Sequence, residues 1–206
     1  MDLCPYCDEL KNGFPYGDRK NRIVYRSKNF YVFPALGQLV EGYLLIASRH
    51  HFISLGGIPT AYYAELQEVR QKVRNALRLV YGPAIFFEHG AVNTNLRGGC
   101  CIDHAHLHAV PTKLDLLDDL TSAFRSRPIN SWEDLARSFR QQHSYLYYEN
   151  QSAQQYLFDA PDNMPAQYIR KLLAKKLGRP NQWNWMTDPT LDKVAKTTDL
   201  LSNVWE

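Results

Sequence analysis

His104-Ala105-His106-Leu107-His108-Ala109-Val110 is the stretch of sequence on which our interpretation of fold and function depends. We predict a strand over residues 102–110, and successive side chains of a strand point to opposite faces. The three imidazoles therefore share one face, and Ala105, Leu107 and Ala109 share the other. Each imidazole has two nitrogens that need partners, and three protonated imidazoles side by side would repel one another. The row suits a neutral nucleophile flanked by groups that bind phosphate, and the alternative is a surface strand with incidental histidines.

The residues before this strand predict an α+β fold. Apolar and β-branched residues favour strands over residues 22–25, 29–33, 43–47 and 84–88, the first three as an antiparallel meander. An amphipathic helix is predicted between Pro59 and Gly82. Its apolar face is formed by Leu66, Val69, Val73, Leu77 and Val80. The first segment, residues 1–17, is rich in turn-forming residues.

The residues after the strand predict an extension rather than a second independent domain. Helices are expected over residues 114–124, 132–141, 166–177 and 190–201, and residues 143–149 and 154–159 are expected to pair as a hairpin. Only Pro111-Thr112-Lys113 separates this part from the strand, which is too short a linker to uncouple two domains. We therefore expect a catalytic domain over residues 1–113, with a mainly helical C-terminal extension over residues 114–206 packed on it.

The histidine row resembles the signature of the histidine-triad (HIT) superfamily, His-x-His-x-His followed by two apolar residues. The preceding Gly99-Cys100-Cys101-Ile102-Asp103 is similar to that family's Gly-Gln-Ser/Thr-Val-x lead-in. Phe87-Glu88-His89-Gly90 resembles the corresponding stretch of galactose-1-phosphate uridylyltransferases, in which the third histidine is a glutamine. Here the third is His108, which places the resemblance nearer the hydrolase branch. The resemblance implies a HIT-like antiparallel sheet with packed helices.

The resemblance also implies a role for each residue of the site. His106 would be the nucleophile, which forms a nucleotidyl-histidine at the α-phosphorus before water releases the nucleotide. His108 would contact the phosphoryl oxygens or the leaving group, and His104 completes the catalytic row. The expected substrate-binding and phosphate-binding residues are Phe33, Asn93, Gly98, Gly99, Cys100 and Cys101.

Four positions depart from the family's pattern. Cys100 and Cys101 replace a polar amide and a hydroxyl, so we expect backbone N–H groups to make the phosphate contact there. Ala35 stands where many members have an aspartate that binds the ribose, and Tyr43 replaces a common histidine. These departures put the family's ordinary nucleoside selectivity in question.

Cys4-Pro5-Tyr6-Cys7 is a Cys-x-x-Cys motif, a pattern typical of zinc sites. The motif has no second pair, so further ligands must come from elsewhere in the chain. In the zinc-bearing branch of the family, a histidine after the third strand and the first histidine of the row complete the site. This implies His104 together with His51, or with the adjacent His50. The resemblance thus implies one structural zinc, and the alternative is two reduced cysteines in a turn.

Composition and charge narrow the choice of partners. The net charge of +3 permits an anionic substrate without requiring nucleic acid. No apolar run approaches membrane-spanning length, and the N-terminus lacks a secretory signal pattern, so we expect a cytoplasmic protein. A basic helix near the C-terminus is either solvated surface or a lid for a distal phosphate or a nucleic-acid end. Its cations are Arg170, Lys171, Lys175, Lys176 and Arg179.

The sequence therefore predicts a nucleotidyl hydrolase that acts on a dinucleoside polyphosphate, a nucleoside phosphoramidate or a related small nucleotide. The alternatives are a transferase or phosphorylase that passes the nucleotidyl group to phosphate or a sugar phosphate, and a non-catalytic nucleotide-binding module. An intact triad favours catalysis, and His108 in place of glutamine disfavours the transferase. A homodimer is expected from the family resemblance alone. Trp183 and Trp185 are expected in the core, with stacking on a base as the alternative.

Overall fold

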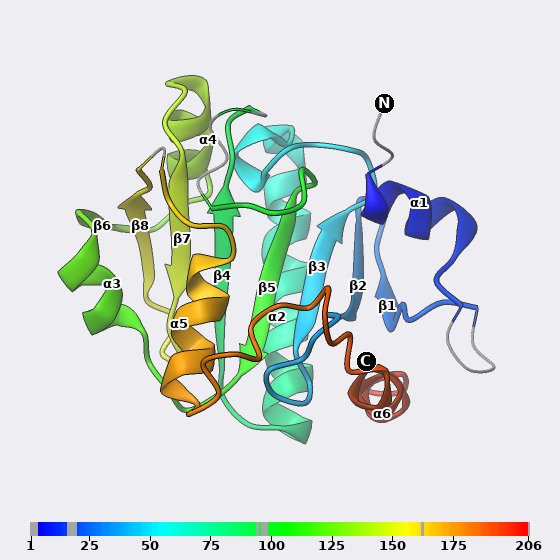
Figure 1. The fold of residues 1–206 in the computed structure, drawn as a ribbon. Coiled ribbons are helices and arrows are strands. Elements are labelled where there is room, and N and C mark those ends of the chain that lie inside the picture. Colours follow the sequence, from blue (N-terminus) through cyan, green and yellow to red (C-terminus); the bar gives the residue numbers. More distant parts are fainter. Residues whose placement is uncertain (1–3, 16–19, 94, 96–98, 162, 206) are drawn as a thin grey trace.

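An antiparallel sheet of eight strands runs through the residues that this computed structural model describes, 4–15, 20–93, 95, 99–161 and 163–205. The strand order is β1-β2-β3-β5-β4-β7-β8-β6, so the histidine strand β5 lies near the centre (Figure 1). The strands are β1 (Tyr25–Arg26), β2 (Phe30–Pro34), β3 (Leu44–Ser48), β4 (Ala84–Gly90), β5 (His106–Pro111), β6 (Ser126–Ile129), β7 (Tyr145–Glu149) and β8 (Gln155–Asp159).

Helices cover both faces of the sheet. In the view of Figure 1, α2 (Tyr63–Val80) lies behind the sheet and α5 (Tyr168–Lys176) lies in front of it. The other helices of the described residues are α1 (Pro5–Asn12), α3 (Leu117–Ala123), α4 (Glu133–Arg140) and α6 (Leu191–Leu201), with 3-10 turns at Leu55–Gly57 and Thr60–Tyr62. None of these helices is long and apolar enough to cross a membrane. The antiparallel sheet with packed helices confirms the predicted α+β class.

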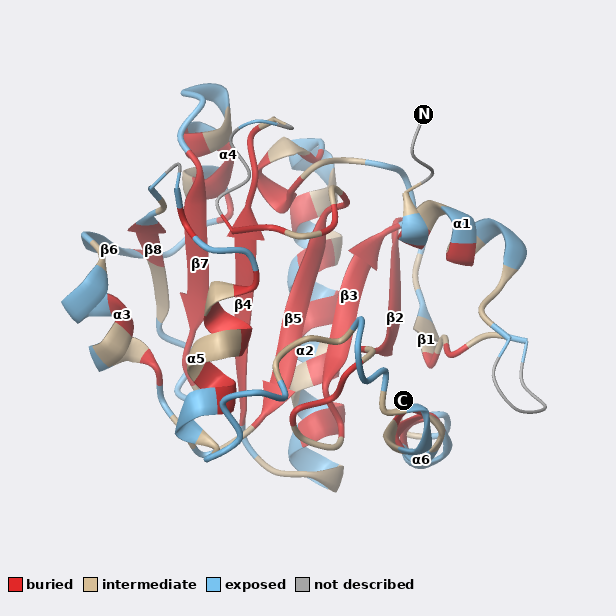
Figure 2. Cartoon of the chain, in the orientation of Figure 1, coloured by how far each residue is buried: buried red, intermediate tan, exposed pale blue. Residues whose placement is uncertain are grey.

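The two sides of β5 confirm the predicted alternation of its side chains. Leu107 and Ala109 belong to the apolar core beneath α2, whereas Val110 belongs to the core beneath α5. His106 and His108 lie on the α5 side, because alternate residues of a strand share a face. Figure 2 shows β3, β4, β5 and β7 buried along their length, so both histidines stand in the interior of the molecule.

β5 begins at His106 rather than at Ile102, so the predicted strand was too long at its N-terminal end. The N–H of His104 donates to the carbonyl of Ile102 at 2.8 Å, which makes a tight turn. The N–H of Ala105 then donates to the carbonyl of Phe52 at 2.6 Å instead of to a strand partner. The first histidine of the row consequently precedes the strand, and its side chain is directed by the turn.

Residues 5–12 form α1, where the sequence analysis expected only turns. Pro5 lies in the first helical turn, where its missing N–H costs nothing. Tyr6 and Glu9 are buried on the inner face, and the Glu9 carboxylate accepts hydrogen bonds of 2.7 and 2.6 Å from buried Arg22. The first strand begins at Tyr25 instead of at residue 22, and Arg22 contacts α1 instead.

The C-terminal extension continues the same sheet. β7 pairs antiparallel with β4, from Phe86 opposite Glu149 to Gly90 opposite Tyr145. β7 and β8 form the predicted hairpin. β6 was not predicted; it pairs with β8 at the edge of the sheet, where the missing N–H of Pro128 is tolerated.

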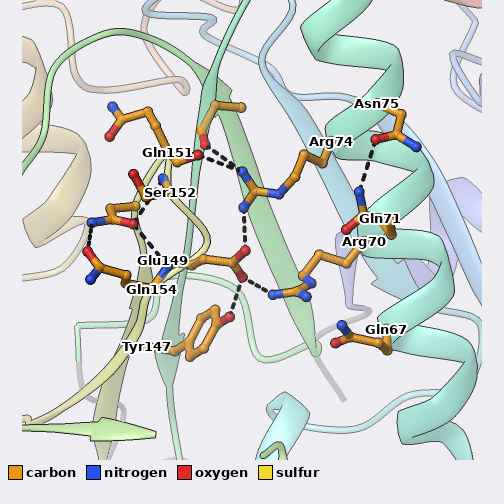
Figure 3. Close-up of polar contacts among 12 residues, drawn as sticks. Gln67, Arg70, Gln71, Arg74, Asn75, Tyr147, Glu149, Gln151, Ser152 and Gln154 are labelled. Atoms are coloured by element: carbon orange, nitrogen blue, oxygen red, sulfur yellow. Dashed lines mark hydrogen bonds and ion pairs between the residues drawn. The ribbon is translucent and has the colours of Figure 1, made fainter. Parts of the chain in front are cut away.

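A buried ionic network joins the extension to helix α2 (Figure 3). The Glu149 carboxylate on β7 accepts hydrogen bonds from Arg70 and Arg74 of α2. It also accepts one from the Tyr147 hydroxyl at 2.6 Å. The carboxylate is fully buried, so solvent and salt screen these ion pairs only weakly. One carboxylate of the extension is thus shared by two arginines of the preceding part of the chain.

The segment after α5 returns to the turn between β2 and β3. The N–H of Gly37 donates to the carbonyl of Pro189 at 3.0 Å. Gly37 has a φ of +61°, and a Cβ atom there would lie 2.5 Å from the Cα of Trp185, so only glycine fits. The N–H of Gly42 donates to Thr197 Oγ1 on α6 at 3.1 Å. These contacts hold Trp185 beside the loop that follows β2.

Candidate active site and metal centre

His106 has one ring nitrogen fixed by the backbone. Its Nδ1–H donates to the carbonyl of His104 at 2.6 Å, and because a carbonyl only accepts, the proton is on Nδ1. Nε2 therefore keeps its lone pair. Burial lowers the pKa of His106, which keeps the ring neutral. A neutral imidazole with a defined Nε2 lone pair has the properties of a nucleophile.

His108 is held by a different partner. The hydroxyl of Tyr43 lies 2.7 Å from His108 Nδ1, and the imidazole stacks on Phe87 at a ring separation of 4.4 Å. Burial holds the pKa of His108 well below its usual range, with smaller contributions from His106 and other neighbouring groups. Burial also raises the pKa of Tyr43 to about 12, so its hydroxyl keeps its proton. The His106 and His108 rings are 4.7 Å apart, close enough to act on one ligand.

His104 faces a different set of residues. Its Nδ1 lies 3.4 Å from Cys4 Sγ and 3.5 Å from Cys7 Sγ. Its Nε2–H donates to the carbonyl of Ser48 at 2.7 Å, which leaves Nδ1 without a proton. His51 completes the group, with Nδ1 3.4 Å from Cys7 Sγ. The predicted metal ligands are therefore together, with all four ligand atoms within 4.8 Å of one another.

The distances in this group fit a tetrahedral zinc ion. Bonds of about 2.3 Å to sulfur and about 2.0–2.1 Å to nitrogen place S and N about 3.5 Å apart at the tetrahedral angle. The S–N distances of 3.4–3.5 Å match that value. The bond from His104 Nε2 to the Ser48 carbonyl is the kind of outer contact that orients a metal-binding histidine. The donor set of two thiols and two imidazoles is also one that zinc prefers.

The structure distinguishes the two adjacent histidines that the sequence left open. His51 belongs to the group of four residues that could hold a metal ion, and His50 is exposed and outside it. Tyr6, between the two cysteines, packs edge-on against both His104 and His106, at ring separations of 5.7 and 5.3 Å. Helix α1 therefore links the metal-binding group to the histidine strand.

A cavity of about 250 Å³ opens in front of His106 and His108. Its walls come from α1, from the loop after β2, from the segment before β5 and from the extension. The lining residues are Pro5, Tyr6, Asp8, Glu9, Gly13, Phe14, Arg22, Ala35, Leu36, Leu45, Cys101, Ile102, His106, His108, Arg170 and Trp185. The walls are mainly apolar and carry charges of both signs, with Glu9 paired to Arg22. A cavity of this kind can hold a ligand that has an apolar and a charged part.

A much smaller cavity adjoins the same two histidines. It is lined by His89, Gly99, Cys100, Cys101, His106, His108, Gln167 and Arg170. Gly99 has a φ of +80°, which brings its backbone close to this cavity without the strain that a side chain would add. Cys101 lines both cavities, whereas the Cys100 thiol donates to the carbonyl of Ile102 at 2.9 Å.

The other predicted substrate-binding residues lie elsewhere. Phe33 is buried beneath Tyr6, at a ring separation of 5.6 Å, and is not among the cavity-lining residues. Asn93 contacts Gln142, with Nδ2 3.4 Å from Oε1, and is not among the lining residues either. Gly98 lies outside the described residues.

His89 is a site residue that the sequence analysis did not assign. It is buried, lines the smaller cavity, and its ring lies 6.3 Å from that of His108. Burial, with help from His106 and Arg170, lowers the pKa of His89 to about 3, so the ring is neutral. The signal was present in the sequence: His89 alternates with Phe87 on the neighbouring strand, and Phe87 stacks on His108.

No family model matches the chain, and no curated protein matches it. The chain is similar to several solved structures. One is described as a Zn-bound histidine triad family protein from Mycobacterium smegmatis, with 21% identity and a TM-score of 0.43, over 68% of this chain and 92% of that protein. Another is a hypothetical histidine triad nucleotide-binding protein from Sulfolobus tokodaii, with 18% identity and a TM-score of 0.45, over 68% of this chain and 91% of that one.

A third similar structure is a Hit-like protein involved in cell-cycle regulation from Bartonella henselae. It shares 16% identity and a TM-score of 0.46, over 69% of this chain and 98% of that protein. These descriptions name the family that the His-x-His-x-His motif had suggested. The chain resembles histidine-triad proteins, with a Cys-x-x-Cys pair beside the first histidine of the row.

Proposed function

We propose that the protein is a nucleotidyl hydrolase in which His106 forms a covalent bond to the substrate's α-phosphorus. The observation that supports this most directly is the hydrogen bond from His106 Nδ1–H to the His104 carbonyl. It presents the Nε2 lone pair of a neutral imidazole, and Nε2 is the atom that must attack. The cavity of about 250 Å³ opens onto His106 and His108 and is lined by apolar residues and Arg170, which suits part of a nucleotide.

The reaction proceeds in two balanced steps. In the first, His106 Nε2 forms a bond to phosphorus while the bond from phosphorus to the leaving group breaks, and the leaving group departs with that electron pair. In the second, water attacks phosphorus, the P–N bond breaks, and the nucleoside monophosphate is released. The proton lost by the water passes to the departing product or to solvent, and His106 returns to its neutral form.

His108, oriented by Tyr43, supplies a hydrogen-bond donor to the first step. In this proposal the Tyr43 hydroxyl donates to His108 Nδ1, which lies 2.7 Å away, so the proton of the neutral His108 ring is on Nε2. An Nε2–H directed at the ligand stabilises the charge that develops on a phosphoryl oxygen or on the leaving group. The backbone of Gly99 adds close contact to the anion.

The metal-binding group serves the site indirectly in this proposal. Cys4, Cys7, His51 and His104 would hold a structural zinc, which would supply folding free energy and fix α1 over the histidine strand. The carbonyl of His104 is the acceptor that sets the His106 tautomer, so the same residue would connect the metal centre to the nucleophile. A homodimer and a cytoplasmic location remain predictions from the sequence.

Replacement of the nucleophile tests the proposal. We expect His106→Ala to lower kcat/KM by about 1,000-fold or more on the best substrate of a nucleotide panel, because the covalent step is lost. The wild-type enzyme, quenched during turnover, should contain a His106 peptide heavier by one nucleoside monophosphate. Exposed His143 provides the control, since His143→Ala should retain full activity. Retention of more than about a tenth of the activity by His106→Ala would rule out the covalent mechanism.

A further inference from the structure

Arg170 is a buried cation that has no carboxylate partner among the described residues. It is 3% exposed, on the first turn of α5. Its Nε donates to the carbonyl of Trp183 at 3.0 Å and its Nη2 to the carbonyl of Gly37 at 2.7 Å. A guanidinium stays protonated in proteins, and a buried charge without a counter-charge is costly. The positive charge of Arg170 is therefore available to an anion.

Two other buried arginines have their positive charges paired with carboxylates. Arg22 is paired with Glu9, and Arg70 is paired with Glu149. Each of these carboxylates is itself buried, so each of these arginines has a counter-charge away from water. Arg22 also lines the larger cavity, but its charge is paired with Glu9. Arg170 is equally buried and lines both cavities, and what distinguishes it is that no carboxylate of the described residues pairs with it.

The groups around Arg170 do not supply negative charge. Burial holds the pKa values of His89, His106 and His108 below their usual range, so all three rings are neutral. Tyr43, whose ring lies 5.3 Å beneath the Arg170 guanidinium, keeps its proton. The wall of the cavity at this point therefore has a net positive charge.

Gln167, immediately before α5, is 4% exposed and lines the smaller cavity with Arg170. Its φ of +61° is strained for a residue other than glycine, a feature often found at functional sites. The N-terminus of α5 begins here and adds the partial positive charge of a helix dipole.

We propose that Arg170, supported by the N-terminus of α5, binds a phosphate group of the leaving group that His106 expels. This inference rests on the proposed function. Arg170 lies over the Tyr43 ring, and the hydroxyl of that ring contacts His108, so Arg170 is placed with His108, the residue proposed to serve the leaving group. In a displacement at phosphorus the leaving group departs opposite the nucleophile, which separates Arg170 from the attack by His106.

A phosphate-binding Arg170 would distinguish between two of the candidate substrate classes. A dinucleoside polyphosphate has an anionic leaving group that Arg170 can bind, whereas a nucleoside phosphoramidate expels an uncharged amine. Because of Arg170, the enzyme should prefer the dinucleoside polyphosphate. The C-terminal extension would then contribute directly to substrate selection.

Pyrophosphate binding and substrate preference test this assignment. By calorimetry on the full-length protein, pyrophosphate should bind Arg170→Gln about 10- to 100-fold more weakly than wild type, the usual effect of losing a charge-assisted hydrogen bond. Lys175→Ala, which removes an exposed cation from the same helix, should bind within about twofold of wild type. In turnover, Arg170→Gln should lose a similar factor in kcat/KM on a dinucleoside tetraphosphate and less than about threefold on a phosphoramidate of the same base.

The outcomes separate the two proposals. Pyrophosphate binding that is unchanged in Arg170→Gln, or equal losses on both substrates, would overturn the role of Arg170 while leaving the covalent mechanism intact. Absence of an adduct on His106 would overturn the mechanism, and the pyrophosphate titration would still decide whether Arg170 binds the anion. If Arg170→Gln does not fold, Arg170→Lys replaces it. The lysine keeps the charge but loses the planar fork, so we expect an intermediate loss of pyrophosphate affinity, and wild-type affinity would contradict the proposal.

Discussion

His106 and His108 are two residues apart on one strand, yet they have different partners at Nδ1. The Nδ1–H of His106 donates to a backbone carbonyl, whereas Nδ1 of His108 lies 2.7 Å from the Tyr43 hydroxyl. With Tyr43 as the donor, as proposed, one ring presents a lone pair from Nε2 and the other presents an N–H. A nucleophile and a hydrogen-bond donor would then stand side by side without either ring becoming charged.

Removal of the Tyr43 hydroxyl should impair turnover more than binding. We expect Tyr43→Phe to lower kcat by about 10- to 100-fold, with KM changed by less than about threefold, because His108 loses its fixed Nε2 proton. Nitrogen NMR of the labelled imidazoles should show His108 as a mixture of tautomers in the variant. Tyr148→Phe is the matched control, since that buried hydroxyl bonds to Asp115, outside the cavity, at 2.7 Å. An unchanged kcat in Tyr43→Phe would show that Tyr43 does not position His108.

Among the elements, α1 depends on the group formed by Cys4, Cys7, His51 and His104. α1 has only eight residues and no side-chain cap at its N-terminus, which is too short to be stable alone. The group ties it to the turn after β3 and to the turn before β5. A zinc ion bound there would hold three separate segments of the chain together.

Metal removal should therefore destabilise the protein. We expect one zinc per chain by elemental analysis of protein purified without chelator, and a lower Tm after treatment with a strong chelator, because structural zinc contributes folding free energy. His51→Ala should lose the metal and show the same lower Tm. His50→Ala should keep both, since that exposed neighbour lies outside the group. Metal-free wild-type protein, or loss of metal from His50→Ala alone, would contradict the ligand set.

Helix α2 and strand β7 depend on the Glu149 network of Figure 3. Glu149→Gln should lower the free energy of unfolding by about 3–5 kcal/mol, because Arg70 and Arg74 are left as unpaired charges in a buried site. Denaturant unfolding measures this loss. Asp159→Asn serves as the control: its ion pair with Arg127 is exposed at 3.7 Å, and its loss should cost less than about 1 kcal/mol. Equal costs for both variants would mean that the network contributes no more than a surface pair.

At the scale of the whole molecule, both halves of the chain contribute strands to one sheet. β7 occupies the edge of β4 that the first half leaves unpaired, and the Glu149 carboxylate forms ion pairs with two arginines of α2. Arg170 and Trp185 of the extension line the same cavity as His106. We propose that residues 114–206 are an integral part of the catalytic unit and not a removable appendage.

Truncation tests this proposal. A chain ending at Lys113 lacks β7, one of the two strands that pair with β4. It also lacks the counter-charge of Arg70 and the lining residues Arg170 and Trp185 of the cavity. We expect it to be insoluble, or to unfold without a cooperative transition, as measured by calorimetry and circular dichroism. A soluble truncated protein that unfolds cooperatively and keeps the kcat and KM of the full chain would show that the extension is an appendage.

Local patterns in the sequence were enough to predict much of the architecture. Alternation along the histidine strand placed Leu107 and Ala109 opposite His106, because pleating is a property of the strand itself. The helix after Pro59 and the hairpin of β7 and β8 were predicted from periodicity and turn residues for the same reason. The missed elements, α1 and β6, are short, and their conformations depend on distant partners.

The chemistry of the site was less accessible from the sequence, because it depends on which distant residues meet. Alternation alone placed the three histidines on one face, and only the family resemblance assigned His104 to the cysteines; in the structure the turn at Ile102 brings His104 to them and leaves His106 and His108 at the cavity. Neither the choice of His51 over His50 nor the unpaired charge of Arg170 is visible in any local pattern. The repeating geometry of a strand or a helix is set within a few neighbouring residues. The residues that could hold a metal ion, and the partners of a buried charge, are instead set by packing between segments that can lie a hundred residues apart in the sequence.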